Sequence, residues 1–267
     1  MDRATLGRLR KIIYERSGIV LGDNKEALIC ARLNKRMQLL GIEDARAYLG
    51  YLLEDGTGEE MVQLVDVIST NVTSFFREGE HFAFLGGLVS QWANEGQRRF
   101  RLWSAACSTG EEPYSVLMAV LDALKSRSVD LKILATDISR RVLDACACGV
   151  YEAGKVKTIP GLLRDRYFER KREGRGVVYS VKEELKQRIA FRWLNLSRPP
   201  FPMRGPFDAI FCRNVMIYFD QRTRLNLLAE LHRLLRPGGY LMVGHAESLS
   251  GIGNGFRIVK PSIYLKA

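Results

Sequence analysis

The sequence predicts an α/β protein in which a Rossmann-like, mainly parallel sheet follows a separate set of helices. From about residue 100 onward, short apolar runs with strand character alternate with helical segments, whereas residues 1 to about 70 show helical spacing only. Such alternation is typical of βαβ units and of a doubly wound sheet. We therefore predict a helical domain over residues 1–72 and an α/β domain over residues 73–267.

The helices of the first domain follow from apolar periodicity and from the residues that punctuate it. Apolar residues recur at helical spacing between Leu6 and Ile13, and Gly18 predicts the end of this helix. A second helix is expected over residues 24–40, which begins at a favourable N-cap and is followed by Gly41. Two more helices are expected around residues 48–53 and 61–68.

The expected strands of the second domain are short and apolar. They cover residues 101–106, 132–136, 189–194, 209–212, 240–243 and 262–265. Helices are expected over residues 113–125, 140–148, 162–167 and 221–235. The stretch around residues 168–185 differs because it is basic, carries glycines and contains the β-branched pair Val177-Val178. We expect it to form a small β-subdomain outside the main sheet.

The composition bounds the location of the protein and the kinds of partner it can have. Lys and Arg number 41 against 30 Asp and Glu, a formal net charge of +11, which favours an acidic protein surface, nucleic acid or an anionic membrane as partner. No apolar run reaches the roughly 18 residues that a membrane span needs, and the first residues lack a signal core. We expect a cytoplasmic protein without direct membrane insertion. The five cysteines lack metal-site spacing, and no metal site is expected.

The most informative segment is RLWSAACSTGEEPYS, residues 101–115. A strand leads into a loop of small residues that includes Ala105, then Gly110, then a helix, which is where a doubly wound fold holds a nucleotide-like cofactor. Glu111 and Glu112 follow the glycine directly, and two carboxylates at that place would repel a pyrophosphate. They suit a cationic cofactor without phosphate, a description that S-adenosylmethionine fits.

A second segment, ILATDIS at residues 133–139, ends an apolar strand in Asp137. An acid at the end of the second strand is where Rossmann-type folds bind ribose hydroxyls. Taken alone, Asp137 is equally compatible with an N-cap of the next helix. Its combination with the first segment favours the cofactor.

Two further segments place polar residues where a binding crevice is expected. In FDAIFCRNVMIYF, residues 207–219, a strand ends in Arg213 and Asn214, at the sheet edge where open α/β folds bind ligands. In TNVTSFFRE, residues 70–78, polar residues flank two phenylalanines at the junction of the two domains. There we expect the phenylalanines to pack and Arg77 to point into the cleft.

Five segments together resemble the motifs of the chemotaxis receptor methyltransferases of the CheR family: TNVTSFFRE, WSAACSTGEEPYS, LATDIS, FDAIFCRNVMIYFD and LLRPGGYLMVGHAES. The resemblance covers nearly the whole chain, and the combination is highly specific although no single motif is. It implies a class I S-adenosylmethionine-dependent methyltransferase fold. It also implies methyl transfer to glutamate carboxylates of methyl-accepting chemotaxis receptors, giving glutamyl methyl esters and S-adenosylhomocysteine.

The resemblance also implies the site residues, which are the positions of this sequence that match the family's motifs. Those expected to bind the cofactor are Asn71, Thr73, Arg77, Ala105, Gly110, Glu111, Glu112, Asp137, Asn195, Leu196, Arg213 and Asn214. Those expected to act in catalysis are Arg77, Tyr218 and Arg213. A glutamate carboxylate is ionised at neutral pH, so the reaction needs alignment and partial desolvation rather than a strong general base.

The partners follow from the same resemblance. Receptor methylation helices in this family's partners are acidic, and the basic helix over residues 24–40 is therefore the expected docking face. Its cations are Lys25, Arg32, Lys35 and Arg36. We expect a monomer that binds no nucleic acid. Some family members bind a receptor's C-terminal peptide at a glycine-rich loop. Here that stretch is RKREGRG, residues 170–176, which is far more basic and leaves the tether an open question.

Two other functions fit parts of the pattern. A nucleic-acid methyltransferase would use the positive charge to bind phosphate. However, the segment after the fourth strand is CRNVMIYFD, which has neither a DPPY- or NPPY-like motif nor a Pro-Cys nucleophile. The other alternative is a regulatory protein that binds S-adenosylmethionine without turnover, which transfer assays separate from an enzyme.

Overall fold

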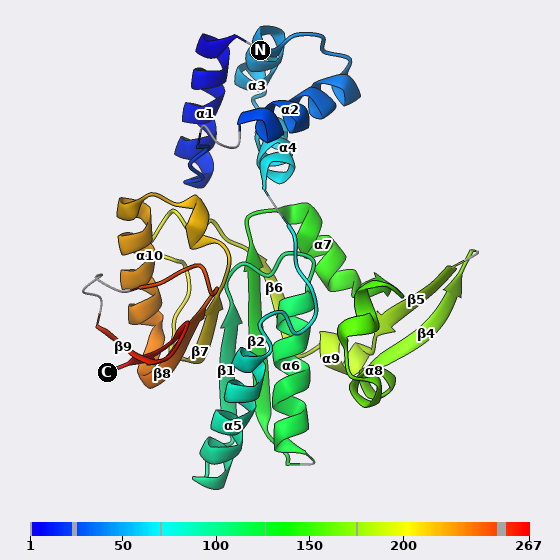
Figure 1. Cartoon of the computed structure of the whole chain (residues 1–267), viewed down its shortest axis with the longest axis vertical. Coiled ribbons are helices and arrows are strands. Elements are labelled where there is room, and N and C mark those ends of the chain that lie inside the picture. The colour runs from blue at the N-terminus through cyan, green and yellow to red at the C-terminus, as the bar shows by residue number, and fades with distance from the viewer. Residues whose placement is uncertain (1, 23–25, 70, 126, 175, 250–254) are drawn as a thin grey trace.

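The computed structural model describes residues 2–22, 26–69, 71–125, 127–174, 176–249 and 255–267. A small helical domain stands above a larger α/β domain, and a single stretch of chain joins the two (Figure 1). Among the described helices, none is long and apolar enough to cross a membrane.

The helical domain contains the four helices that the apolar periodicity predicts. They are α1 (Arg3–Ser17), α2 (Glu26–Leu40), α3 (Ala45–Glu54) and α4 (Glu59–Ile68). Helix α1 ends at Gly18, whose left-handed φ of 73° is the conformation in which glycine ends helices most easily. The four helices share one apolar core centred on Leu9, Leu33, Tyr48 and Leu64. The predicted start of α2 at residue 24 lies outside the described residues.

The main sheet has seven strands in the order β6-β2-β1-β7-β8-β10-β9, and its first five strands are parallel. The strands are β1 (Arg99–Ser104), β2 (Asp130–Asp137), β6 (Ile189–Trp193), β7 (Phe207–Cys212), β8 (Leu235–Val243), β9 (Phe256–Lys260) and β10 (Ile263–Lys266). Strand β10 runs antiparallel to both of its neighbours, β8 and β9. The mainly parallel, Rossmann-like sheet is therefore confirmed.

Helices cover both faces of this sheet. Successive residues of a strand point to opposite faces and therefore pack into different apolar cores. Leu102 packs with α5 (Glu80–Asn94) and α6 (Glu111–Leu124), whereas its neighbour Trp103 packs on the side of α10 (Gln221–Leu234). Helix α7 (Arg140–Cys148) lies beside β2 and β6.

Helix α5 and strand β9 of this domain were not predicted. Strand β8 begins at Leu235 rather than at the expected residue 240, and it includes the segment Pro237–Gly239. Between Phe207 and Ala209 of β7, the partner residue moves from Leu235 to Tyr240. The Pro-Gly-Gly segment is therefore an irregularity in the β7–β8 pairing.

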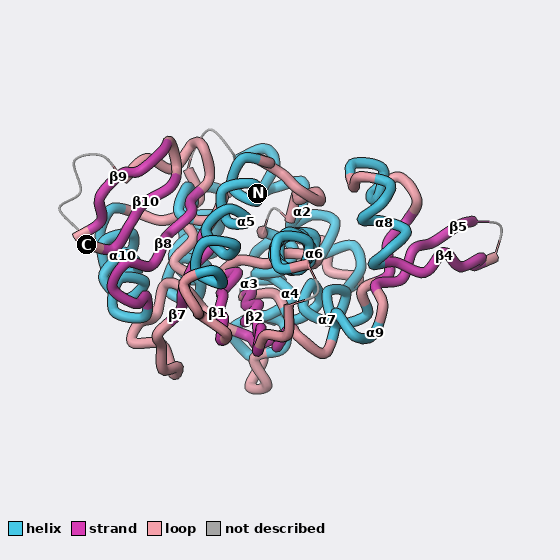
Figure 2. The backbone as a smooth tube through the Cα atoms, turned by 90° about the horizontal axis from the view of Figure 1, so that it is seen from below, coloured by secondary structure: helices cyan, strands magenta, loops and turns pink. Residues whose placement is uncertain are grey.

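The expected β-subdomain is present as a second sheet of three antiparallel strands. It comprises β3 (Val150–Glu152), β4 (Phe168–Glu173) and β5 (Gly176–Val181), with α8 (Gly161–Tyr167), α9 (Glu183–Lys186) and the short 3-10 helix η2 (Lys155–Thr158) around it. The β4–β5 hairpin projects from the body of the protein, at the end opposite to β9 (Figure 2). Phe75 packs edge-on against Tyr151 and Phe168, so the segment before α5 is held on this subdomain.

Candidate cofactor site

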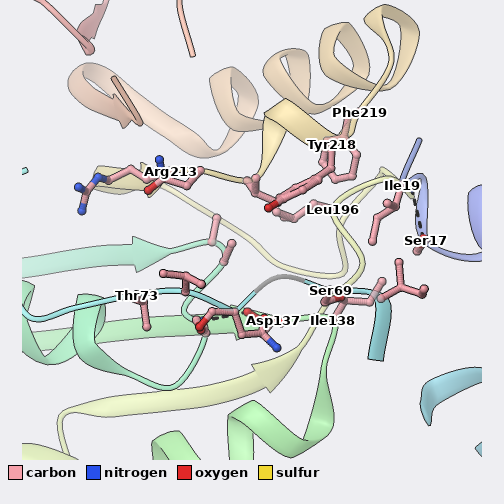
Figure 3. Close-up of a pocket in the computed structure, with 18 of the residues that line it drawn as sticks. Ser17, Ile19, Ser69, Thr73, Asp137, Ile138, Leu196, Arg213, Tyr218 and Phe219 are labelled. Atoms are coloured by element: carbon pink, nitrogen blue, oxygen red, sulfur yellow. Dashed lines mark hydrogen bonds between the residues drawn. The ribbon is translucent and has the colours of Figure 1, made fainter. Parts of the chain in front are cut away.

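A pocket lies at the carboxyl ends of β1, β2, β6 and β7, where the helical domain meets the sheet. The chain runs outward from β1 through β2 to β6 and then returns to place β7 on the other side of β1. Open α/β sheets bind ligands at such a reversal, because the connections diverge there and leave a crevice. In Figure 3, Thr73 and Asp137 face Arg213 and Tyr218 across the opening.

Asp137, the last residue of β2, presents a nearly buried carboxylate to this pocket. Its Oδ2 accepts a hydrogen bond from the backbone N–H of Ser108 (2.9 Å) and its Oδ1 from that of Ser139 (3.1 Å). A carboxylate has about four acceptor positions, so capacity for two hydroxyl groups is left. Burial raises the pKa of Asp137, although these N–H groups act in the opposite direction. The N-cap of α7 is Ser139, so the alternative assignment of Asp137 as that cap is not adopted.

The loop after β1 is already committed to hydrogen bonds within the protein. Its donating amides are those of Ala105, Cys107, Ser108 and Gly110, which bind oxygens of Phe211, Thr136, Asp137 and Cys107 respectively. Pyrophosphate-binding loops need backbone N–H groups that point at the ligand. These four amides do not serve that purpose, which agrees with a cofactor that carries no phosphate.

A chain of charges crosses the floor of the pocket. Glu112 Oε1 accepts from the Ser104 hydroxyl (2.7 Å), and its Oε2 accepts from Arg213 Nη1 (3.0 Å). The other Arg213 nitrogen, Nη2, donates to Glu78 Oε2 (2.9 Å) and to the backbone carbonyl of Arg77. One guanidinium therefore joins two carboxylates and fixes the backbone beside Arg77.

The two carboxylates share this guanidinium unequally. Burial raises the pKa of Glu112, and the charge of Arg213 together with its hydrogen bond does not fully offset that effect. For Glu78, burial again acts to raise the pKa, but the hydrogen bond and charge of Arg213, together with those of His245, outweigh it, so the pKa is lowered. Glu112, which lines the pocket, is the carboxylate that gains more from a further cation.

Arg77 and Tyr218 enter the pocket from different segments. Arg77 is half-buried, and its Nη1 donates to the carbonyl of Val72 (2.9 Å) in the strap that joins the domains. Tyr218 ends the 3-10 helix η3 (Met216–Tyr218) that follows β7, and its carbonyl accepts from the N–H of Val20 (2.8 Å). The arrangement puts a cation and a phenol beside one cavity.

Asn195 lines the pocket and also links the two domains. Its Nδ2 donates to the carbonyl of Arg16 at the end of α1 (2.7 Å), and its Oδ1 accepts from the backbone and hydroxyl of Ser197. A Cβ at Gly18 would lie 2.3 Å from that of Ser197, so the backbones meet there without room for a side chain. The N-terminal domain is thereby held against the pocket.

Of the residues expected at the site, most line this pocket. They are Asn71, Thr73, Arg77, Ala105, Glu112, Asp137, Asn195, Leu196, Arg213, Asn214 and Tyr218. Gly110 and Glu111 are not among the lining residues. Glu111 is fully buried, and its carboxylate binds Lys155 Nζ (2.7 Å) and the Thr109 hydroxyl (2.6 Å). Gly110 has a φ of 99°, and a Cβ there would lie 2.6 Å from Cys146 Sγ, so its contribution is to the backbone path.

The sequence did not indicate that the helical domain forms one wall of the pocket. That wall consists of Ser17, Ile19, Val20, Leu21, Ile29, Arg32, Ile68 and Ser69 (Figure 3). It is largely apolar, as the flank of a purine ring would require. No local sequence signal marks these residues, because they reach the site only through the packing of two domains.

Glu247 is a second contributor that the sequence analysis missed. It is buried, and its carboxylate accepts from the backbone N–H groups of Asn214 (2.6 Å), Gly244 (2.8 Å) and Ile217 (3.3 Å). These bonds hold Asn214 in the left-handed conformation, with φ 57°. The signal that could have revealed it is an acidic residue four positions after an apolar strand.

Family comparisons agree with this division of the chain. Residues 71–265 match the family model described as "CheR methyltransferase, SAM binding domain", and residues 4–69 match "CheR methyltransferase, all-alpha domain". The pocket is built where the two matched regions meet.

Relatives named chemotaxis protein methyltransferase match over nearly the full chain. The relative from Klebsiella aerogenes is 38% identical over 264 residues, which cover 99% of this chain and 90% of that protein. The relative from Borreliella burgdorferi is 39% identical over 269 residues, which cover 98% of this chain and 93% of that protein. The relative from Escherichia coli is 38% identical, with coverage of 99% and 91%.

Proposed function

Because the chain belongs to the CheR methyltransferase family, whose larger domain binds S-adenosylmethionine, we propose that it methylates glutamate side chains of chemotaxis receptors. The products would be glutamyl methyl esters and S-adenosylhomocysteine. The observation that carries this proposal is the pocket, in which Asp137 at the end of β2 and Glu112 in the first turn of α6 line the same cavity as Arg77 and Tyr218.

The pocket residues suit each part of the cofactor. Asp137 has acceptor capacity for the two ribose hydroxyls, Glu112 gains from an ammonium group, and the helical-domain wall supplies apolar surface for adenine. When bound, the cofactor supplies an electrophilic methyl group on a sulfonium sulfur. No residue has to remove a proton, because the acceptor carboxylate is already ionised.

The protein must also align the acceptor carboxylate with the methyl group. We assign Arg77 to bind the acceptor carboxylate by charge-assisted hydrogen bonds and Tyr218 to position it next to the methyl group. We assign Arg213 as a positioning residue rather than a catalytic one, since both of its Nη atoms bind Glu112, Glu78 and the carbonyl of Arg77. It holds the backbone from which Arg77 extends.

Helix α2 is our proposed docking face for acidic receptor helices, although its cations differ in availability. Arg32 donates to the carbonyls at the end of α4, and Arg36 pairs with Glu60. Lys35 is exposed, whereas Lys25 lies outside the described residues. We therefore propose that Lys35 carries more of the receptor contact than either arginine, with the protein acting as a cytoplasmic monomer.

The test uses labelled S-adenosylmethionine and a receptor cytoplasmic fragment. We expect label on the receptor that base releases as methanol, and loss of it when the acceptor glutamates are changed to glutamine. Arg77→Ala should bind S-adenosylhomocysteine within about threefold of the unaltered protein and lose at least ~100-fold in transfer. The matched control is Arg46→Ala, which removes an exposed arginine of α3.

Three results would contradict the proposal. Base-stable label would point to a methylated amine or ring, and label on nucleic acid alone would point to a different substrate. Cofactor binding without transfer to any receptor fragment would leave a regulatory protein.

A further inference from the structure

A histidine that the reaction does not use is buried without a hydrogen-bond partner. His81 lies in the first turn of α5 and is 0% exposed. Within the part of the chain that the structure describes, neither of its ring nitrogens makes a hydrogen bond. Buried polar atoms are nearly always paired, since an unpaired one loses its bonds to water and gains nothing in return. Among the described residues, both ring nitrogens of His81 are therefore uncommitted and able to bind a ligand.

Two other metal-ligating side chains face the same point. Glu78 Oε2 lies 3.6 Å from His81 Nδ1 and 3.9 Å from His245 Nε2. The two imidazole rings stand nearly perpendicular, with centroids 5.6 Å apart. One ligand atom from each of the three residues lies within 4.8 Å of the other two. Glu78 precedes α5, His81 lies in the first turn of α5, and His245 lies in the loop after β8, which is far away in the sequence.

The two separations that involve Glu78 are close to what a tetrahedral ion requires. Zinc binds imidazole nitrogen and carboxylate oxygen at about 2.0–2.2 Å, which puts neighbouring ligand atoms roughly 3.3 Å apart. Glu78 Oε2 needs to move only a few tenths of an ångström relative to each nitrogen to reach that separation. The backbone already holds Glu78 in the sparsely populated left-handed region, with φ 58°.

The carboxylates of the cluster also favour a cation. Arg213 is the nearby positive charge, and two carboxylates, those of Glu78 and Glu112, bind it. Glu80 Oε1 contacts His245 Nε2 and offers a further oxygen at the rim.

We propose that Glu78, His81 and His245 bind a divalent cation of the zinc class beside the cofactor pocket. Two imidazoles and one carboxylate select zinc and its transition-metal neighbours, whereas calcium and magnesium prefer oxygen ligands alone. Since Glu78 is also bound to Arg213, the ion and the guanidinium would share one carboxylate.

The experiment titrates chelator-treated, full-length protein with zinc by calorimetry and with cobalt by visible absorption. We expect one ion per chain and a cobalt spectrum of histidine-ligated, tetrahedral type. His245→Gln should weaken zinc binding at least tenfold, and its exposed position leaves the fold intact. His81→Gln should do the same. The matched control is His232→Gln, because His232 in α10 is the third histidine of the chain and packs on Phe256 instead.

The proposal fails if zinc causes no saturable heat, or if the octahedral cobalt spectrum of a water-rich site appears. It also fails if His232→Gln weakens binding as much as His245→Gln does. An octahedral spectrum would mean that the cation binds at carboxylates elsewhere on the surface, and a loss in His232→Gln would mean that it binds at His232. A His81→Gln protein that does not fold leaves His245→Gln and Glu78→Gln to decide.

Discussion

Two arginines, one in each domain, bind buried carboxylates, and their networks differ in how the charges balance. In the helical domain, Arg36 Nε donates to Glu60 Oε1 (3.0 Å), its Nη2 binds Oε2, and Tyr48 donates its hydroxyl to Oε1 (2.6 Å). Burial raises the pKa of Tyr48, which therefore stays a donor. One cation meets one carboxylate, and all three residues belong to α2, α3 and α4.

In the catalytic domain, one cation meets two carboxylates. Arg213 lies between Glu112 and Glu78 and leaves a surplus of negative charge at the floor of the pocket and at its rim. A balanced pair has no need of a ligand, whereas an unbalanced cluster is stabilised by an incoming cation. The comparison indicates that similar Arg–Glu chemistry supports the fold in one domain and prepares a binding site in the other.

The largest effect is expected when the shared cation is removed. Arg213→Ala removes the guanidinium that pairs with Glu112 and Glu78, and breaking a buried pair costs about 3–5 kcal/mol of the free energy of unfolding. Methyl transfer should fall at least ~100-fold as well, because the backbone at Arg77 loses its anchor. Urea unfolding and a methyl-transfer assay measure the two losses.

Arg213→Lys is the matched control for that variant. It keeps the charge but cannot span two carboxylates with a planar fork, so both losses should be intermediate. A fully stable and active Arg213→Ala protein would remove the distinction between the two networks.

The second effect concerns the pH dependence of cofactor affinity. Since burial raises the pKa of Asp137, the carboxylate that is to accept the ribose hydroxyls takes up a proton at a higher pH than an ordinary aspartate. Affinity should therefore be complete at pH values above that raised pKa. It should fall by up to about tenfold per pH unit as the solution is acidified through it. Calorimetry with S-adenosylhomocysteine over a pH series measures the slope.

Asp137→Asn tests whether that slope belongs to Asp137. It should bind on the order of 100-fold more weakly at neutral pH and show a shallower slope, with Glu112 as the remaining buried acid. Asp144→Asn, an exposed residue of α7, should match the unaltered protein. An unchanged slope in Asp137→Asn would assign the titration to another group.

Local patterns made one half of the pocket predictable. The strand–loop–helix around Ala105 and the acid at the end of β2 follow from hydrophobic runs and turn residues over a few positions. Asp137 and Glu112 line the pocket as the sequence indicates. Glu111 does not, because Lys155 of the subdomain binds its carboxylate, a long-range contact with no local signal.

The elements that were missed have physical reasons too. Helix α5 contains the pair Gly86-Gly87, which weakens its helical pattern. Gly86 faces Ala123 of α6, and a Cβ there would make an ordinary contact at 3.6 Å, so the packing of α5 on α6 does not depend on this glycine. Strand β9 is an edge strand whose residues are mostly exposed, so no buried face marks it. The helical-domain wall depends on contacts such as Val20 to Tyr218, almost two hundred positions apart.

The smallest effect on the pocket is expected from the balanced network. Arg36→Ala leaves Glu60 with Tyr48 as its remaining side-chain donor, and we expect a loss of about 2 kcal/mol in the free energy of unfolding. Affinity for S-adenosylhomocysteine should stay within about twofold, because none of these three side chains lines the pocket. Arg46→Ala, an exposed arginine of α3, should change neither quantity. A tenfold loss of cofactor affinity in Arg36→Ala would instead mean that the substitution shifts Arg32, another residue of α2, which does line the pocket. The two networks would then be energetically coupled.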